Sequence, residues 1–249
     1  MSAISCGRRR LCVQEIRNLF SMSQVQRVLG LFAKEPRPGQ VKTRLAAATS
    51  LAWAARVADA FLRDQLERLA RIPARLVLAF TPASARPFFE SVSGSFALTP
   101  QVEGDLGQRM RAFFEQQLAG GADAIVLLGT DSPTVPLAFV EQAFRELKQA
   151  DLVLGPATDG GYYLIGIGRR LPPIFEGVAW STRRVLAETI ERLDDPAWRL
   201  ALLPPWYDVD TLDDWNLLRG HLAALQRAGH AIDVPHTHAL LNAPDEERS

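Results

Sequence analysis

One aspartate stands where an α/β sheet would bind a ligand. Residues 125–128, IVLL, form a short apolar run, which predicts a strand buried on both faces of a parallel sheet. Gly129 ends the run, Asp131 follows it, and Pro133 and Pro136 open a helix. Because ligands of such sheets bind at the carboxyl ends of the strands, Asp131 is a candidate ligand of a hard cation such as Mg²⁺ or Mn²⁺. The alternative is that Asp131 is only a turn or helix-cap residue.

Two further carboxylates follow much later in the chain, in the segment D-V-D-T. Asp208 and Asp210 point the same way if this segment is extended, so one of them could complete a cation site with Asp131. Asp210 is favoured, because it precedes Thr211, the expected cap of a helix, and so lies nearest to the positive helix end. Without a cation, like charges this close are expected to raise at least one carboxyl pKa and to cost stability.

The loop 34–44, KEPRPGQVKTR, follows the first expected strand and is rich in basic side chains. Lys34, Arg37, Lys42 and Arg44 could meet phosphate oxygens, and Arg44 could do so through two parallel hydrogen bonds. Gly39 would let the backbone approach a ligand. A phosphate site is favoured over a solvated basic turn, because nucleotide sites of βα units lie directly after a strand. The loop lacks the second glycine of a Walker A sequence.

A glycine-containing segment, E-G-D-L-G-Q-R at 103–109, opens an expected helix. Gly107 suits a close backbone contact with a ligand, and Arg109 adds a positive charge. For Asp105, the simpler interpretation is a plain helix N-cap.

Two loops are candidates for the side of the site that takes the second substrate. Asp159, Gly160 and Gly161 predict a tight turn between two strands, where a plain hairpin turn competes with a role for Asp159 as a base. Trp180 lies in V-A-W-S-T, just before another expected helix. Core packing is its default role, and stacking on an acceptor molecule is the alternative.

Alternating strands and helices must position these loops. Strands are predicted at 25–33, 75–80, 96–99, 125–128, 151–157, 162–167 and 199–203, with 162–167 antiparallel to 151–157. Helices are predicted at 45–70, 106–118 and 137–149, from a cap at Ser181 or Thr182 to 193, and from Thr211, which forms a capping box with Asp214. The alternation predicts an α/β protein with a mostly parallel sheet, and no linker divides it, so one domain is expected at 25–240.

Composition excludes several partners. The 28 basic and 28 acidic residues give a formal net charge of zero, which does not favour binding to nucleic acid. No apolar run approaches the ~20 residues of a membrane span, so no membrane partner is expected. Cys6 and Cys12 are the only cysteines, which argues against a disulfide framework and fits a cytoplasmic location.

The two ends are expected to stand apart from the domain. Residues 1–24 carry a basic cluster without a following apolar region, so they are not expected to be a secretory signal but a poorly ordered extension, and Met22 could be the true start. Residues 241–249 are expected to be a tail. His236 and His238 near this end make a weak zinc site, because no cysteine accompanies them.

Six ordered motifs resemble one known family. They are GLFAKEPRPGQVKTRLA, GDLGQRM, LLGTDSPTVP, LVLGPATDGGYYLIGI, VAWST and DVDTLDDW. Together they resemble the bacterial radical SAM/selenodomain-associated transferase family. That family is similar to 2-phospho-L-lactate guanylyltransferase and to nucleotide-diphospho-sugar transferases with the glycosyltransferase-A fold. The resemblance covers about residues 27–240, and six motifs in order are far more specific than any one of them.

The resemblance implies a single-domain, three-layer sandwich of the glycosyltransferase-A or Rossmann-like type. Asp131 would take the place of the metal-binding aspartate, and one aspartate of D-V-D-T would complete the metal site. The acceptor side would include Gly160, Gly161 and Trp180. The implied nucleotide-binding residues are Phe32, Ala33, Lys34, Gly39, Lys42, Arg44, Asp105, Gly107 and Arg109. Leu212 departs from the family, which commonly has proline there, but proline is not required to start a helix.

The implied reaction is metal-assisted transfer from a nucleotide-activated donor to a small-molecule acceptor. Mg²⁺ or Mn²⁺, with Lys42 and Arg44, would neutralise the leaving group, and Asp159 is the candidate base. A glycosyltransferase would release a nucleoside diphosphate, whereas a nucleotidyltransferase would attack the α-phosphorus and release pyrophosphate. Glycosyl transfer is favoured on the resemblance alone.

Other classes fit less well. A non-catalytic nucleotide-binding protein is the alternative outside the enzymes. An aspartyl-phosphate phosphatase is disfavoured, because the chain after D-V-D-T carries no further set of the required motifs. The oligomeric state is left open.

Overall fold

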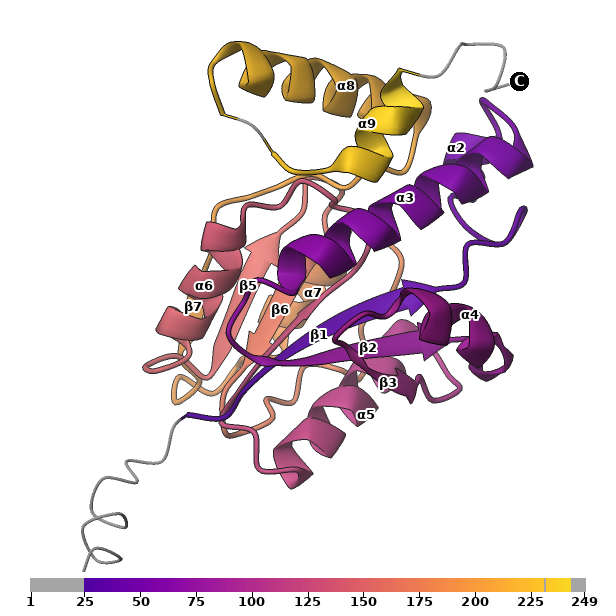
Figure 1. The fold of residues 1–249 in the computed structure, drawn as a ribbon. Coiled ribbons are helices and arrows are strands. Elements are labelled where there is room, and N and C mark those ends of the chain that lie inside the picture. The colour runs from indigo at the N-terminus through magenta and orange to yellow at the C-terminus, as the bar shows by residue number, and fades with distance from the viewer. Residues whose placement is uncertain (1–24, 231, 243–249) are drawn as a thin grey trace, which may run out of the picture.

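A seven-stranded sheet forms the middle of the molecule (Figure 1). The computed structural model describes residues 25–230 and 232–242. The expectation for 1–24 lies outside the described residues, and so does that for the tail at 241–249 from residue 243 on, whereas Leu241 belongs to the last helix. The strand order is β3-β2-β1-β4-β6-β5-β7. The strands are β1 (Arg27–Lys34), β2 (Arg75–Thr81), β3 (Ala97–Pro100), β4 (Ala124–Leu128), β5 (Leu152–Pro156), β6 (Tyr162–Ile167) and β7 (Leu200–Leu202). Only β6 runs antiparallel to its neighbours, so the prediction of a mostly parallel α/β sheet is confirmed.

Helices cover both faces of the sheet. The helical segments are α2 (Thr43–Ala46), α3 (Leu51–Leu69), η1 (Ala83–Ala85), α4 (Arg86–Val92), α5 (Leu106–Ala119), α6 (Leu137–Glu146), α7 (Val185–Glu191), α8 (Leu212–Arg227) and α9 (Pro235–Leu241). One apolar cluster joins one face of the sheet to α3, α4 and α6, and a second joins the other face to α5 and α7. A third cluster packs α8 and α9 on the outer side of α3. Within the described ranges, no helix has the length and apolar character to cross a bilayer.

The central strand β4 is the strand that the sequence indicated most clearly. All five of its residues are buried, because β4 lies between β1 and β6 and has helices over both faces. The carboxyl ends of β1 and β4 and the start of the antiparallel strand β6 therefore meet at one edge of the sheet. Loops from these three strands can share one site.

Two helices begin at residues other than those predicted. The helix expected at 45–70 is broken into α2 and α3, because Ser50 is extended and its hydroxyl accepts a hydrogen bond from the Trp53 N–H, which caps α3. The expected cap of α7 at Ser181 or Thr182 is also wrong, since α7 begins at Val185 and its N-cap position makes no side-chain hydrogen bond. The Thr182 hydroxyl instead accepts from the Arg184 N–H, within the loop before the helix.

The C-terminal helix α9 was missed by the sequence reasoning, which predicted no helix after the one that begins at Thr211. Asp64 of α3 is fully buried and caps this helix. Its carboxylate accepts hydrogen bonds from the His236 N–H at 3.0 Å, the Thr237 N–H at 2.8 Å and the Thr237 hydroxyl at 2.6 Å. One side chain from the middle of α3 thus positions a short helix whose local start signal is a proline, Pro235, in its first turn.

We expect Asp64→Ala to destabilise the fold by about 2–3 kcal/mol, because it leaves buried donors of Thr237 without an acceptor. Glu67→Ala is the matched control: Glu67 lies on the same helix and contacts only the exposed ring of His236, so its loss should cost less than ~1 kcal/mol. Urea unfolding of both variants measures the difference. Equal costs would show that Asp64 does not anchor α9.

Candidate active site

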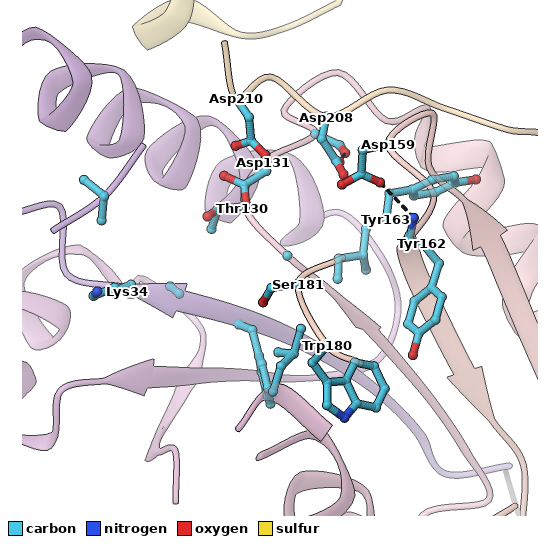
Figure 2. Close-up of a pocket in the computed structure, with 18 of the residues that line it drawn as sticks. Lys34, Thr130, Asp131, Asp159, Tyr162, Tyr163, Trp180, Ser181, Asp208 and Asp210 are labelled. Atoms are coloured by element: carbon cyan, nitrogen blue, oxygen red, sulfur yellow. Dashed lines mark hydrogen bonds between the residues drawn. The ribbon is translucent and has the colours of Figure 1, made fainter. Parts of the chain in front are cut away.

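A cavity of about 880 Å³ opens at the edge of the sheet where β1 and β4 end and β6 begins. Its polar lining comes from segments far apart in the sequence. Figure 2 shows the four carboxylates of Asp131, Asp159, Asp208 and Asp210 gathered at one end and Trp180 at the other. The sequence predicted this edge from the ends of the strands, and the topology brings the loops there.

A buried lysine joins three of these loops. The Lys42 ammonium lies 2.6 Å from the Asp131 carboxylate, 2.7 Å from the Val209 carbonyl oxygen and 3.5 Å from the Asp210 carboxylate. Its side chain is only 3% exposed and lies over the Phe61 ring. Lys42 was expected to meet a phosphate; in the structure its ammonium is instead the counter-ion of two carboxylates. A role toward a nucleotide stays a prediction.

The charge on Lys42 is stabilised by its partners. Burial alone would lower the pKa of the ammonium, but attraction by Asp131 and Asp210, with the hydrogen bond to Asp131, outweighs it and raises the pKa. The backbone of Lys42 is in the left-handed region, with φ 44° and ψ 46°, which is uncommon for a residue other than glycine. Such a conformation persists only where the surroundings require it, and the buried ion pair is such a requirement.

Side chains of α3 fix the backbone of the loop that carries Asp131. The Gln65 amide donates to the Gly129 carbonyl at 3.0 Å, and the Arg68 guanidinium donates to the carbonyls of Pro133 and Val135. Both side chains are buried, so these donors are available only to the loop. The loop can therefore hold a polar, irregular backbone next to the core without leaving its carbonyl groups unpaired.

The segment with the other two carboxylates is tied to the same loop. The Val209 N–H donates to the Asp131 carbonyl oxygen at 2.9 Å, and the Asp208 carboxylate accepts a hydrogen bond from the Ser132 hydroxyl. At the start of α8, the Asp214 carboxylate accepts from the N–H groups of Asp210 and Thr211. The predicted capping box of Thr211 and Asp214 is present, and it sets the direction of the chain at Asp210.

The carboxylates differ in their surroundings. Burial, with repulsion from Asp131, Asp159 and Asp210, raises the pKa of Asp208 to about 7, although the Ser132 hydrogen bond opposes this. Burial and then Asp131 also raise the pKa of Asp210, against the attraction of Lys42 and Arg44. The sequence attributed such a rise to like charges, but desolvation is the larger cause. Asp210, which was favoured over Asp208 as the second metal ligand, shares the Lys42 ammonium with Asp131. Which of the two aspartates would bind a metal ion stays a prediction.

The loop 178–184, which directly precedes α7, forms part of the cavity wall. A Cβ at Gly107 would lie 2.2 Å from the Trp180 indole nitrogen, and a Cβ at Gly160 would lie 2.2 Å from the Arg183 carbonyl oxygen. The two glycines therefore leave room for this loop. Gly160, with φ 96°, also makes the tight turn, in which Asp159 accepts from the Gly161 N–H at 2.9 Å.

Most predicted site residues line the cavity. They are Phe32, Ala33, Lys34, Lys42, Arg44, Arg109, Asp131, Asp159, Gly161, Trp180, Asp208 and Asp210. Gly39, Asp105, Gly107 and Gly160 are not part of the lining; Asp105 is the N-cap of α5, with a capping box to Gln108. The sequence reasoning did not single out some lining residues, among them Gln101, Thr130, Ser132, Tyr162, Tyr163 and Arg183. Only Tyr162 and Tyr163 had a signal, namely their place directly after the Asp159 turn.

The donor set at Asp131 and Asp210 fits a hard cation. Both groups offer carboxylate oxygens, and the structure already gathers them around one positive charge. In the described part of the chain, no group of three or more histidine, cysteine, aspartate or glutamate side chains is arranged to hold a metal ion by itself. A Mg²⁺ or Mn²⁺ ion held here would therefore draw its remaining ligands from water or from phosphate oxygens, as Mg²⁺ commonly does.

Comparisons with known proteins agree with the architecture. A crystal structure from Desulfovibrio desulfuricans G20, described as a "putative nucleotide-diphospho-sugar transferase", is 32% identical with a TM-score of 0.78, covering 88% of this chain and 97% of that chain. The inositol-1-phosphate CTP transferase from T. maritima is 14% identical, with a TM-score of 0.54 and coverage of 84% and 99%. The CMP:2-keto-3-deoxy-manno-octonic acid synthetase complexed with CTP is 13% identical, with a TM-score of 0.51 and coverage of 80% and 99%.

The last two likenesses show the fold alone. The search of curated proteins finds no match to the sequence. A family model matches residues 65–182, which include the loop of Asp131, the Asp159 turn and Trp180. With that match, and with a relative that is 32% identical over nearly its whole length, the chain belongs to the family DUF2064, described as an uncharacterized protein conserved in bacteria.

Proposed function

We propose that this protein is a metal-dependent transferase that uses a nucleotide-activated donor, and that it moves a glycosyl group from a nucleotide sugar to a small acceptor. The observation that carries the proposal is the convergence of Asp131 and Asp210 on one positive charge inside a cavity of about 880 Å³. The D. desulfuricans relative, described as a "putative nucleotide-diphospho-sugar transferase", supports the choice of a nucleotide sugar as donor. Membership of the radical SAM/selenodomain-associated group stays a prediction from the motifs.

Cationic groups of the cavity would receive the phosphates of the donor. Lys34 ends β1, is exposed, and forms no ion pair with another residue of the described chain. Arg44 pairs with Asp210 and keeps a side chain that is 63% exposed, so part of its guanidinium stays open to a ligand. We assign the diphosphate to Lys34 and Arg44, with Lys42 acting behind them as the fixed charge that holds Asp131 and Asp210 together.

The transfer itself needs a base and a stabilised leaving group. In glycosyl transfer, the acceptor oxygen forms a bond to the anomeric carbon of the sugar, the bond from that carbon to the diphosphate breaks, and its electron pair leaves with the nucleoside diphosphate. The proton of the acceptor hydroxyl would pass to Asp159, whose exposed carboxylate lines the cavity. A divalent cation bound at Asp131 and Asp210 would neutralise the negative charge that develops on the diphosphate.

A donor panel tests the proposal directly. The protein is incubated with Mg²⁺ or Mn²⁺, with nucleotide sugars or nucleoside triphosphates and with small hydroxyl-bearing acceptors, and the release of nucleoside diphosphate and of pyrophosphate is measured. We expect nucleoside diphosphate from at least one nucleotide sugar and no pyrophosphate from any triphosphate. Pyrophosphate release would establish nucleotidyl transfer instead. Binding without any turnover would favour a non-catalytic nucleotide-binding protein.

Asp131→Asn tests the cation site. We expect metal-dependent turnover to fall at least about a hundredfold, the scale of removing one electrostatic group from an active site. Because the buried Lys42 loses its nearest carboxylate, the variant should also be destabilised by about 1–3 kcal/mol while remaining folded. Asp213→Asn, at an exposed carboxylate of α8, is the control and should change neither quantity. Full activity of Asp131→Asn would remove Asp131 from the mechanism.

A further inference from the structure

The cationic side chains of the cavity divide into two groups. Lys42 and Arg44 are bound to carboxylates, and Arg109 donates to the Gly104 carbonyl and to the Gln101 amide oxygen. Lys34 and Arg183 line the same cavity, are exposed, and form no ion pair with any described carboxylate. Lys34 is already assigned to the donor. Arg183 lies in the loop 178–184, in contact with the Asp159 turn, and has no assigned partner.

The loop that carries Arg183 is held in place at both ends. The Ala179 N–H donates to the buried Glu188 carboxylate at 2.6 Å, and the Leu186 N–H donates to the Gly160 carbonyl at 2.9 Å. The backbone of Arg183 packs against Gly160 so closely that no side chain could be accommodated at position 160. Arg183 therefore projects from a fixed backbone rather than from a mobile turn, which lowers the entropy lost when it binds a ligand.

The apex of the same loop is strained. Ser181 has φ 64°, a left-handed conformation that is unusual for a residue other than glycine, and its side chain lines the cavity beside Trp180 (Figure 2). Backbone strain of this kind concentrates at ligand-binding and catalytic sites, where the surrounding structure enforces it. Strain at Ser181 and fixation of Arg183 are separate observations on one loop, and both indicate that the loop is shaped for a ligand.

The neighbouring arginine is different. Arg184 is also exposed, but its guanidinium lies 2.9 Å from the Glu188 carboxylate, one helical turn later, so its charge is neutralised within α7. Arg183, one position earlier, has the same side chain but no such partner among the described residues, and it lines the cavity. Guanidinium groups bind carboxylate and phosphate through paired, charge-assisted hydrogen bonds.

We propose that Arg183 binds an anionic group of the acceptor, a carboxylate or a phosphate, and so selects anionic over neutral acceptors. This inference rests on the proposed transferase function, because it treats the Asp159 side of the cavity as the acceptor side. The backbone contact between Arg183 and Gly160 would then place the anionic end of the acceptor beside Asp159, the candidate base. The reacting hydroxyl would lie at the Asp159 turn and the anion at the Arg183 loop, two segments whose backbones are in contact.

Calorimetric titrations test the proposal on the whole chain. The probes are glycerol 3-phosphate, glycerate and neutral glycerol, and the proteins are wild type, Arg183→Gln, Arg184→Gln and Lys34→Gln. We expect wild type to bind an anionic probe and not glycerol, and Arg183→Gln to weaken that binding about ten- to a hundredfold. Arg184→Gln should bind within about twofold of wild type, because its charge is already paired. The phosphate and carboxylate probes show which anion is preferred.

Several outcomes would overturn it. They are equal binding of glycerol and the anionic probes, no binding of either anionic probe to wild type, equal effects of Arg183→Gln and Arg184→Gln, or loss of anion binding only in Lys34→Gln, which would place the anion at the donor site. Nucleotide affinity separates this inference from the proposed function. Lys34→Gln should weaken binding of any nucleotide that wild type binds, whereas Arg183→Gln should leave it unchanged.

Discussion

The site depends on one buried positive charge, the ammonium group of Lys42. Lys42 belongs to the loop that follows β1, and its ammonium contacts the loops that follow β4 and β7. One group therefore fixes three segments that are distant in sequence. Without it, Asp131 and Asp210 would repel each other at the edge of the core, and burial already disfavours the charged form of Asp210. Because the ammonium is almost fully buried, its attraction to these carboxylates is less screened than on the surface. A left-handed backbone at Lys42 accompanies this arrangement.

The glycines of the motifs illustrate how one loop can depend on distant residues. Gly107 lies in the first turn of α5 and Gly160 lies in a turn before β6, yet each leaves the space that the loop 178–184 occupies. A side chain at either position would displace Trp180 or Arg183 and would change the cavity without touching a ligand. Glycines near a site can therefore serve the packing of a wall rather than the approach of a substrate, and the two roles are not distinguished by sequence alone.

Local signals were sufficient for the sheet and for several helix starts. The apolar run of β4, the N-cap at Asp105 and the capping box at Thr211 depend on neighbouring residues, and all three were predicted. The ion pairs of Lys42 were not predicted, because its partners are carboxylates 89 and 168 positions away in the chain, whose distances to the ammonium only the fold determines. Helix α9 was missed for the same reason, since its start is capped by Asp64 from another helix. Strands and helix caps that depend on neighbouring residues could be predicted. Ion pairs and hydrogen bonds between residues far apart in the sequence could not, because only the tertiary structure brings those residues together.

The cavity places four carboxylates where an anionic donor would have to bind, and the structure reduces the resulting repulsion. Lys42 neutralises charge on Asp131 and Asp210, and Arg44 adds a second cation at Asp210. With its pKa raised to about 7, the buried Asp208 carries less negative charge at neutral pH than an exposed aspartate would. Asp159, which is exposed, is the one whose charge is left most open to the cavity. In the proposed reaction, Asp159 would take the proton of the acceptor, and Lys42 and Arg44 would offset the charge of Asp131 and Asp210 at the same end of the cavity (Figure 2), so that the phosphates of a donor could bind there.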